Sequence, residues 1–361
     1  MEVLSRLALN RALLARQHLL DRADLDPITA LRDLVGLQAQ SPQAPYVGLW
    51  ARLANFKPER LSDLIADRQA VRAVLMRATI HLVTAEDCLA LWPLIVPALE
   101  RSVYPNIMYG RHRLEGLDLT AVLASGRRLV EAQPRTASEL RDLLAPDWPD
   151  RDPAALAYAV RQLLPLVHVP PRGLWRVSGQ PRFTTVESWL GRGAEPDPSV
   201  VRMVRRYLAA FGPATVRDVQ TWSGLTRLRE VVERLPLARF RDEHGRNLYD
   251  LPNAPRPDPS TPAPVRLLPE YDNLLVSHAD RSRVMPDGYL TRIATCGSFL
   301  VDGFVRGRWK LTSQNKAALL RIEIFEPVSP SDISALEAEG ARLLDFAIPD
   351  AVTRDIEVQR R

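Results

Sequence analysis

A short pattern of residues occurs three times in the first two-thirds of the chain, and this repeat restricts the fold more than any other feature. The copies are Thr29-Ala-Leu-Arg-Asp-Leu34, Thr136 with Leu140-Arg-Asp-Leu143, and Thr215-Val-Arg-Asp-Val219. Thr136 and Glu139 have the spacing of a helix capping box, and Thr215 and Asp218 approximate one. We therefore expect each copy to begin a short helix within an internally repeated architecture.

Each copy lies between other predicted elements. A longer amphipathic helix precedes it, in residues 4–19, 122–131 and 200–210. Another helix follows the second and third copies, in residues 155–164 and 225–235, and then a hairpin, in residues 174–186 and 238–251. Helix, helix, helix and hairpin are the elements of a winged helix. The first copy has a strand signal over residues 75–83 and no obvious wing.

Residues rich in Pro and Gly, 191–198 and 252–264, predict boundaries. After residue 264 the pattern changes to short strands, at 265–268, 273–277, 298–301, 304–311 and 318–325, with a two-residue hairpin at Asp302-Gly303 and a closing helix over 333–344. We predict an α+β multidomain protein: three tandem winged-helix modules, 1–118, 119–198 and 199–254, followed by a small β-barrel domain, 265–361.

Charge favours DNA as the partner of these modules. Residues 101–250, which hold two of the copies, contain 23 basic and 17 acidic residues. Only three of the 48 basic residues are lysines, although the codon bias of a GC-rich genome explains this better than phosphate binding does. The alternative is that the winged helices are only packing or protein-docking modules. No secretory signal and no apolar run of about 18 residues is found, so we expect a cytoplasmic protein with no membrane partner.

Most catalytic signatures are absent from the sequence: HExxH, a Walker loop, GxSxG, the dinucleotide glycine fingerprint and the zinc-deaminase motif. The two cysteines, Cys88 and Cys296, have no metal-ligand spacing. We therefore expect an activity without metal or cofactor.

Glutamines crowd the segment Gly36-Leu-Gln-Ala-Gln-Ser-Pro-Gln-Ala-Pro45. If the backbone is extended here, the side chains of Gln38 and Gln40 point the same way and two amides face one cleft. The alternative is that both amides hydrogen-bond the free carbonyls at a helix end. Spacing alone favours the second interpretation.

Three further clusters are polar. Arg77, Thr79 and His81 would share one face of a strand, where a lone histidine is more often structural than catalytic. Residues 267–273 with Asp280-Arg281 form a polar turn that would hold the sheet together. The tract over residues 305–316 could probe a DNA groove or be a solvated edge that discourages strand pairing, and its polar candidates are Arg306, Arg308, Lys310, Gln314, Asn315 and Lys316.

Taken in order along the chain, these motifs resemble the winged-helix DNA glycosylases. The matching residues are Gly36-Leu-Gln-Ala-Gln-Ser-Pro42, Arg77-x-Thr-x-His-Leu82, Leu267-Leu-Pro-x-Tyr-Asp272, Asp280-Arg281 and Val301-Asp-Gly-x-Val-x-Gly-x-Trp309. The chain is most similar to the branch that unhooks interstrand crosslinks and gives azinomycin resistance. In a related branch Asp takes the second position of the glutamine motif, where this chain has Gln40.

The resemblance implies a C-shaped molecule that hydrolyses the N-glycosidic bond of N7-alkylated purines in double-stranded DNA, without cofactor or metal, for base excision repair or self-resistance. It implies that Gln38 and Gln40 are the catalytic pair. We expect Arg77, His81 and the tract over 305–316 to contact DNA, and the protein to act as a monomer. The competing functions are a winged-helix transcriptional regulator and a DNA-binding protein without activity.

Overall fold

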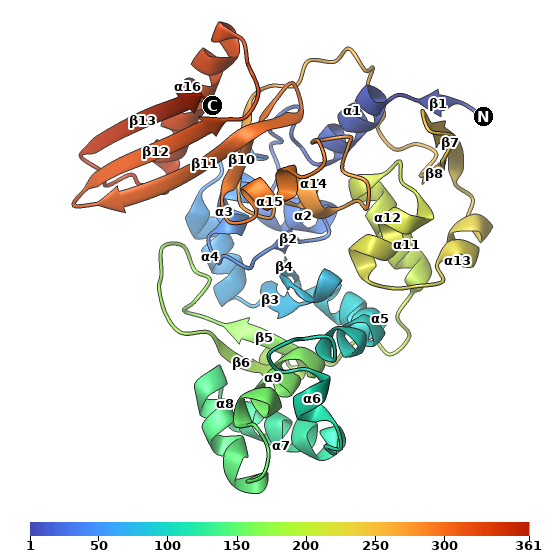
Figure 1. Cartoon of the computed structure of the whole chain (residues 1–361), viewed down its shortest axis with the longest axis vertical. Helices are drawn as coiled ribbons and strands as arrows, with labels where there is room; N and C mark the ends of the chain where they lie inside the picture. The colour runs from blue at the N-terminus through green and yellow to red at the C-terminus, as the bar shows by residue number, and fades with distance from the viewer. Residues whose placement is uncertain (361) are drawn as a thin grey trace.

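The computed structural model describes residues 1–360, which form three β-sheets surrounded by helices (Figure 1). The first part of the chain supplies the centre of the molecule. Its elements are β1 (Val3–Leu4), α1 (Arg6–Arg16), α2 (Pro27–Asp33), β2 (Leu37–Gln38), α3 (Ala44–Trp50), α4 (Pro58–Ala66), β3 (Ala70–Val74), the 3-10 turn η1 (Met76–Ala78), β4 (Ile80–Thr84) and α5 (Ala85–Val103). None of the helices in the described chain combines the length and hydropathy that a membrane span needs.

Two groups of helices follow, each with an antiparallel pair of strands. The first group, green in Figure 1, comprises α6 (Arg111–Leu114), α7 (Leu119–Ala132), α8 (Ala137–Leu144), the 3-10 turn η2 (Ala145–Asp147), α9 (Pro153–Leu163), β5 (Leu166–Val169), β6 (Arg182–Thr185) and α10 (Val186–Leu190). The second group, yellow, comprises α11 (Val200–Phe211), α12 (Val216–Ser223), α13 (Arg229–Arg234), β7 (Ala238–Asp242) and β8 (Asn247–Asp250).

The repeated pattern begins helices, as predicted. Thr136 and Thr215 are the N-caps of α8 and α12, and each forms a complete capping box with the acidic residue three positions later. The first copy is offset, because α2 begins at Pro27 after Asp26 and therefore contains Thr29.

The hairpin predicted over residues 174–186 is wrong in its first strand. Residues 174–177 form a turn in which Arg176 has a φ of 57°, and β6 pairs instead with β5. All four residues of β5 are buried, because this strand lies between β3 and β6 in a sheet of order β2-β4-β3-β5-β6. A strand buried on both faces lacks the alternation that the sequence argument used. The sheet joins the first part of the chain to the first of the two helix groups.

The remainder of the described chain forms the third sheet, drawn in orange and red. Its elements are β9 (Arg266–Leu268), α14 (Asn273–Val276), α15 (Tyr289–Ile293), β10 (Gly297–Val301), β11 (Phe304–Gln314), β12 (Ala317–Ile324), α16 (Pro330–Ala347) and β13 (Thr353–Arg360). The predicted hairpin at Asp302-Gly303 is confirmed, since both residues have positive φ and Val301 pairs with Phe304. The predicted closing helix corresponds to α16.

Two expectations for this segment are wrong. The small barrel is an open sheet in the described residues, of order β13-β12-β11-β10-β9, and α16 packs against it. Residues 273–276, expected in a strand, form α14, because the Asp272 side chain accepts a hydrogen bond from the Leu274 amide and caps a helix. Residue 361, the end of the predicted domain, lies outside the described residues.

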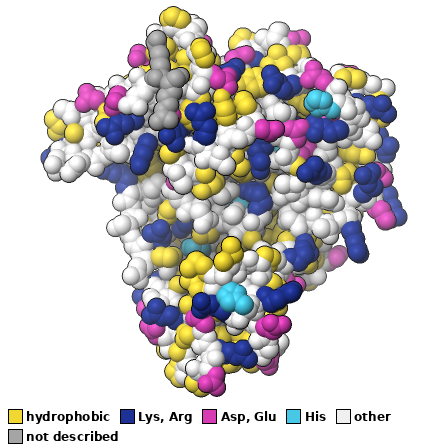
Figure 2. Space-filling model, viewed as in Figure 1, with side chains coloured by type: hydrophobic (Ala, Val, Ile, Leu, Met, Phe, Trp, Pro, Cys, Tyr) yellow, Lys and Arg dark blue, Asp and Glu magenta, His cyan; other side chains and the backbone are white. Residues whose placement is uncertain are grey.

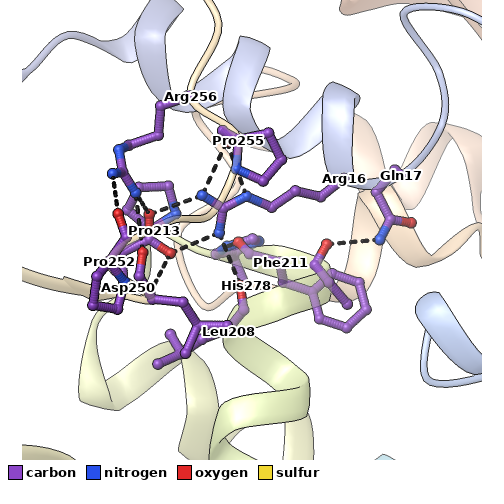
Figure 3. Close-up of polar contacts among 12 residues, drawn as sticks. Arg16, Gln17, Leu208, Phe211, Pro213, Asp250, Pro252, Pro255, Arg256 and His278 are labelled. Carbon is purple, nitrogen blue, oxygen red and sulfur yellow. Dashed lines mark hydrogen bonds and ion pairs between the residues drawn. The ribbon is translucent and has the colours of Figure 1, made fainter. Parts of the chain in front are cut away.

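A buried ion pair attaches the second group of helices, α11–α13 with β7 and β8, to α1 (Figure 3). Arg16 donates to both carboxylate oxygens of Asp250, at 2.7 and 2.8 Å, and also to the Leu208 carbonyl. Arg256 donates to the same carboxylate at 2.6 Å. The side chains of Arg16 and Asp250 are 1% and 0% exposed, so removing one partner leaves charge in an apolar interior.

We expect Asp250→Ala to lower the free energy of unfolding by about 3–5 kcal/mol, because two arginines lose their buried carboxylate. Urea unfolding of the whole protein measures the change. Glu230→Ala, which removes an exposed partner of Arg234, is the control and should cost less than about 1 kcal/mol. Equal losses in the two variants would contradict a structural role for the buried pair.

Candidate functional site

The backbone around Gln38 is fixed by a glycine. Gly36 has a φ of +86°, and a Cβ at this position would lie 2.4 Å from the Val83 side chain and 2.7 Å from the Leu82 carbonyl oxygen. Only glycine allows the chain to turn out of α2 and approach β4 so closely. Gln38 then pairs with His81 across the two strands.

Gln38 is bound through its carbonyl to Arg77. The Arg77 Nη2 atom donates to Gln38 Oε1 at 2.8 Å and to His81 Nε2 at 3.1 Å. Because arginine only donates, His81 Nε2 is an acceptor, and the ring carries its proton on Nδ1, which donates to the Thr79 carbonyl at 2.9 Å. The Gln38 amide therefore directs its carbonyl at Arg77 and keeps its NH2 group for other partners.

Arg77 is not on the strand in which the sequence predicts it. Residues 75–83 comprise a linker residue after β3, the turn η1 and most of β4, and Arg77 lies in the turn with a φ of 56°. The expectation that Arg77, Thr79 and His81 share one face of a strand is therefore wrong. The turn nevertheless brings Arg77 to Gln38 and His81, so three predicted site residues are in contact.

Burial determines the protonation states of the groups in the cluster of Gln38, Arg77 and His81. It lowers the pKa of His81 to about 3, with a smaller contribution from the Arg77 charge. Burial also lowers the pKa of Arg77 to about 10, assisted by the charge of Arg281. At neutral pH the site therefore contains a neutral histidine, a charged arginine and a neutral amide.

Gln40 has different surroundings. Its side chain is exposed, and its Oε1 atom accepts from the Ile80 amide at 3.4 Å, a long hydrogen bond. The neighbouring Ala39 amide donates to the Ile80 carbonyl at 2.8 Å and fixes the backbone. In the described structure neither Gln38 nor Gln40 bonds a carbonyl at a helix end, so that alternative is wrong. Gln43 is the structural amide, joined to Leu174 and Arg176.

The polar turn near residue 272 supports the site. Arg52 donates to both carboxylate oxygens of Asp272, at 2.8 and 2.7 Å, and both side chains are fully buried. The next residue, Asn273, donates to the carbonyls of Gly36 and Leu34, which precede Gln38. The sequence indicated only a turn here. An Asp before an apolar run is an N-cap signal that could have revealed α14, whereas no local signal identifies Arg52.

The basic tract forms the β11–β12 ribbon, which projects to one side of the molecule in Figure 1 and is not part of the Gln38 cluster. Asn315 and Lys316 are its tip, with φ values of 51° and 62° that suit a two-residue hairpin. Arg306 is paired with Glu326, and Arg308 with Glu323. Of the DNA contacts predicted in the tract, Lys310, Gln314, Asn315 and Lys316 are exposed.

Metal-ligating side chains do not gather at the glutamines. Among residues 1–360, no three His, Cys, Asp or Glu side chains lie together in a way that could hold a metal ion. The groups that contact Gln38 and Gln40 are a guanidinium and backbone atoms, with a neutral imidazole behind them.

We expect the free energy of unfolding to fall as the pH drops from about 6.5 toward 3. The pKa of His81 is lower in the folded protein than in the unfolded chain, so on acidification the unfolded chain binds a proton that the folded protein does not bind. The free energy of unfolding then falls by up to about 1.4 kcal/mol for each pH unit. Urea unfolding at pH 7, 6, 5 and 4 measures this slope.

His81→Asn should reduce that slope, although His168 and His278, whose pKa values are also lowered by burial, keep part of it. The control is the same substitution at exposed His112. An unaltered slope in His81→Asn would contradict a neutral His81.

Comparison with known proteins identifies the chain. The family model described as DNA glycosylase AlkZ-like matches residues 31–346. An interstrand DNA cross-link repair glycosylase from Streptomyces sahachiroi is 25% identical over 362 residues, covering 91% of this chain and 92% of that protein. The solved structure of the Streptomyces sahachiroi DNA glycosylase AlkZ has the same fold, with a TM-score of 0.76, 20% identity and full coverage of both chains. The predicted resemblance is confirmed, and the chain belongs to the AlkZ-like family of DNA glycosylases, enzymes that cleave N-glycosidic bonds.

Proposed function

We propose that this protein hydrolyses the N-glycosidic bond of N7-alkylated purines in duplex DNA, including purines in interstrand crosslinks, and leaves an abasic site. The observation that carries the proposal is the chemistry of the site: Gln38 and Gln40 are neutral amides, and the ionisable groups clustered with Gln38 are Arg77 and a neutral His81. The name of the Streptomyces relative supports the crosslink as a substrate.

Such a site suits a base that is already a good leaving group. Glycosidases usually provide an acid for the leaving group and a carboxylate for the sugar cation. An N7-alkylated guanine is cationic. When the C1′–N9 bond breaks, its electron pair goes to the base, which leaves as a neutral molecule without a general acid. Water adds to C1′ and releases its proton to solvent. Undamaged purines lack this activation and are spared.

The two amides have different roles in the remaining tasks, which are to position the substrate, orient water and stabilise the sugar cation. Arg77 holds the Gln38 carbonyl, so Gln38 presents its NH2 group from a fixed position. Gln40 is exposed and has only a 3.4 Å hydrogen bond, so its carbonyl is free to turn toward water or the developing sugar cation. We assign water orientation and charge stabilisation to Gln40, and positioning of the substrate to Gln38.

The units around the site would hold the duplex. We infer that the helices α7–α9 and α11–α13, each with its strand pair, and the first part of the chain act as three winged-helix modules arranged in a C. Lys310, Gln314, Asn315 and Lys316 would enter a groove, while Arg306 and Arg308 brace the ribbon. Figure 2 shows Lys and Arg side chains over much of the face in view, with acidic ones among them. A crosslinked base is tied to the other strand, so cleavage cannot depend on a deep pocket for a flipped base. We expect a monomer that acts on cytoplasmic, nucleoid DNA.

We expect the purified protein to release the base from duplexes that contain N7-methylguanine or an N7 crosslink, detected as strand breaks after alkali treatment. Gln38→Ala and Gln40→Ala should each lower kcat by about 100-fold, the usual cost of losing one preorganised stabilising group. No breaks above the protein-free control would overturn the proposal. Full rates in both variants would overturn only the site assignment, and tight binding to one undamaged sequence would favour a regulator.

Arg77→Met should lower kcat by about tenfold or more, because the freed Gln38 amide loses its orientation. If Arg77 acts through Gln38, affinity for undamaged duplex changes little. A weaker Kd with an unchanged kcat would instead make Arg77 a DNA contact. Arg77→Lys keeps a donor and should recover part of the rate.

A further inference from the structure

A small cavity beside Gln40 is lined by residues from both the first part of the chain and the α7–α9 group. Its volume is about 80 Å³, and its lining includes Gln40, Ile80, Arg161, Gln162, His168 and Phe183. About 10–15 Å³ of such a cavity is enough for one water, so the cavity has room for a group of several heavy atoms.

Arg161 brings an unpaired positive charge to this cavity. Its guanidinium lies over the Phe183 ring, 5.0 Å from the centroid, and its buried Nε atom has no hydrogen-bond partner. Within residues 1–360, no carboxylate lies at ion-pair distance from Arg161. Burial lowers the pKa of Arg161, and the groups that oppose this shift are the phenols of Tyr158 and Tyr109.

Two more arginines add to the positive potential. Arg72 pairs directly with His168 between β3 and β5, is 2% exposed, and has no partner for its Nε and Nη1 atoms. Its Nη2 atom donates to the carbonyl of Ala39, the residue between the two glutamines. The Arg172 side chain donates to the Gly179 carbonyl. The described structure thus holds three arginines here without a carboxylate.

The remaining polar groups of the cavity do not neutralise that charge. His168 is 8% exposed, and its Nδ1 atom has no partner. Burial, followed by the charges of Arg72, Arg161 and Arg172, keeps the pKa of His168 well below its usual range. The buried Oε1 atom of Gln162 also lacks a partner. A cluster of cations that is partly buried and has no counterion is unfavourable, and a bound anion would complete it.

We propose that Arg161, together with Gln162 and His168, binds a backbone phosphate of the damaged strand beside Gln40. The proposal rests on the proposed function, since a duplex provides the anion. A cationic N7-alkylated base is repelled by three arginines, so the cavity selects the phosphate over the lesion itself. The bound phosphate also places negative charge near the sugar on which positive charge develops.

Replacing one phosphate by an uncharged methylphosphonate tests this contact. N7-methylguanine duplexes carry the replacement at each flanking phosphate in turn, and kcat/KM is measured for each. For the wild-type protein we expect one position to cost about 10- to 100-fold, the effect of losing a charged hydrogen bond. Arg161→Gln should show that loss with the natural duplex and no further loss at that position. Arg161→Lys should restore part of it.

Arg141→Gln is the matched control, because Arg141 is exposed on the same group of helices and is paired with Asp142. It should keep the full methylphosphonate penalty. A penalty of equal size at every position in wild type and Arg161→Gln would overturn the phosphate site. The Kd for a duplex with a tetrahydrofuran abasic analogue repeats the test without catalysis. If one methylphosphonate position weakens the Kd but no base is released from the damaged duplex, the proposed function is wrong and the phosphate site remains supported.

Discussion

The ion pair between Arg52 and Asp272 is the contact on which the structure around the glutamines depends. It joins a turn after α3 to the N-cap of α14, two segments 220 positions apart, with neither side chain exposed. Gln17 extends it: the Gln17 carbonyl accepts from Arg52, and its amide donates to Ala210, next to the Arg16–Asp250 pair (Figure 3). Buried charges tolerate little displacement, so these pairs fix the positions of the units.

A short series of contacts connects the Arg52–Asp272 pair to the glutamine site. Asn273 follows Asp272 and binds the carbonyl of Gly36, and Gly36 sets the approach of β2 to β4. The β2–β4 register then puts Gln38 against His81 and within reach of Arg77. Neutral amides can act on a labile bond only from well-defined positions, because they contribute dipoles rather than charge. Orientation therefore replaces acid–base strength in this site.

The sequence predicted the elements whose backbone is determined by neighbouring residues. The capping boxes of Thr136 and Thr215 and the hairpin at Asp302-Gly303 are confirmed because their residues dictate the backbone nearby. The sequence did not predict the elements that depend on contacts between distant segments. The inner strand β5 has no alternation to detect, and Arg77 reaches Gln38 from a left-handed turn rather than along a strand. Arg161 has no motif at all, since its neighbours come from other segments. The glutamine pair itself emerged through family resemblance, not spacing.

The pairing of β1 with β7 has a consequence for synthesis on the ribosome. Val3 and Leu4 lie parallel to Arg241 and Asp242, so β1 has no partner until β7 has emerged. Asp272, the ion-pair partner of Arg52, is synthesised later still. During that interval the nascent chain exposes a strand edge and an uncompensated arginine, both of which other molecules can contact. The contacts of β1 and Arg52 can therefore form only after much later segments have been synthesised.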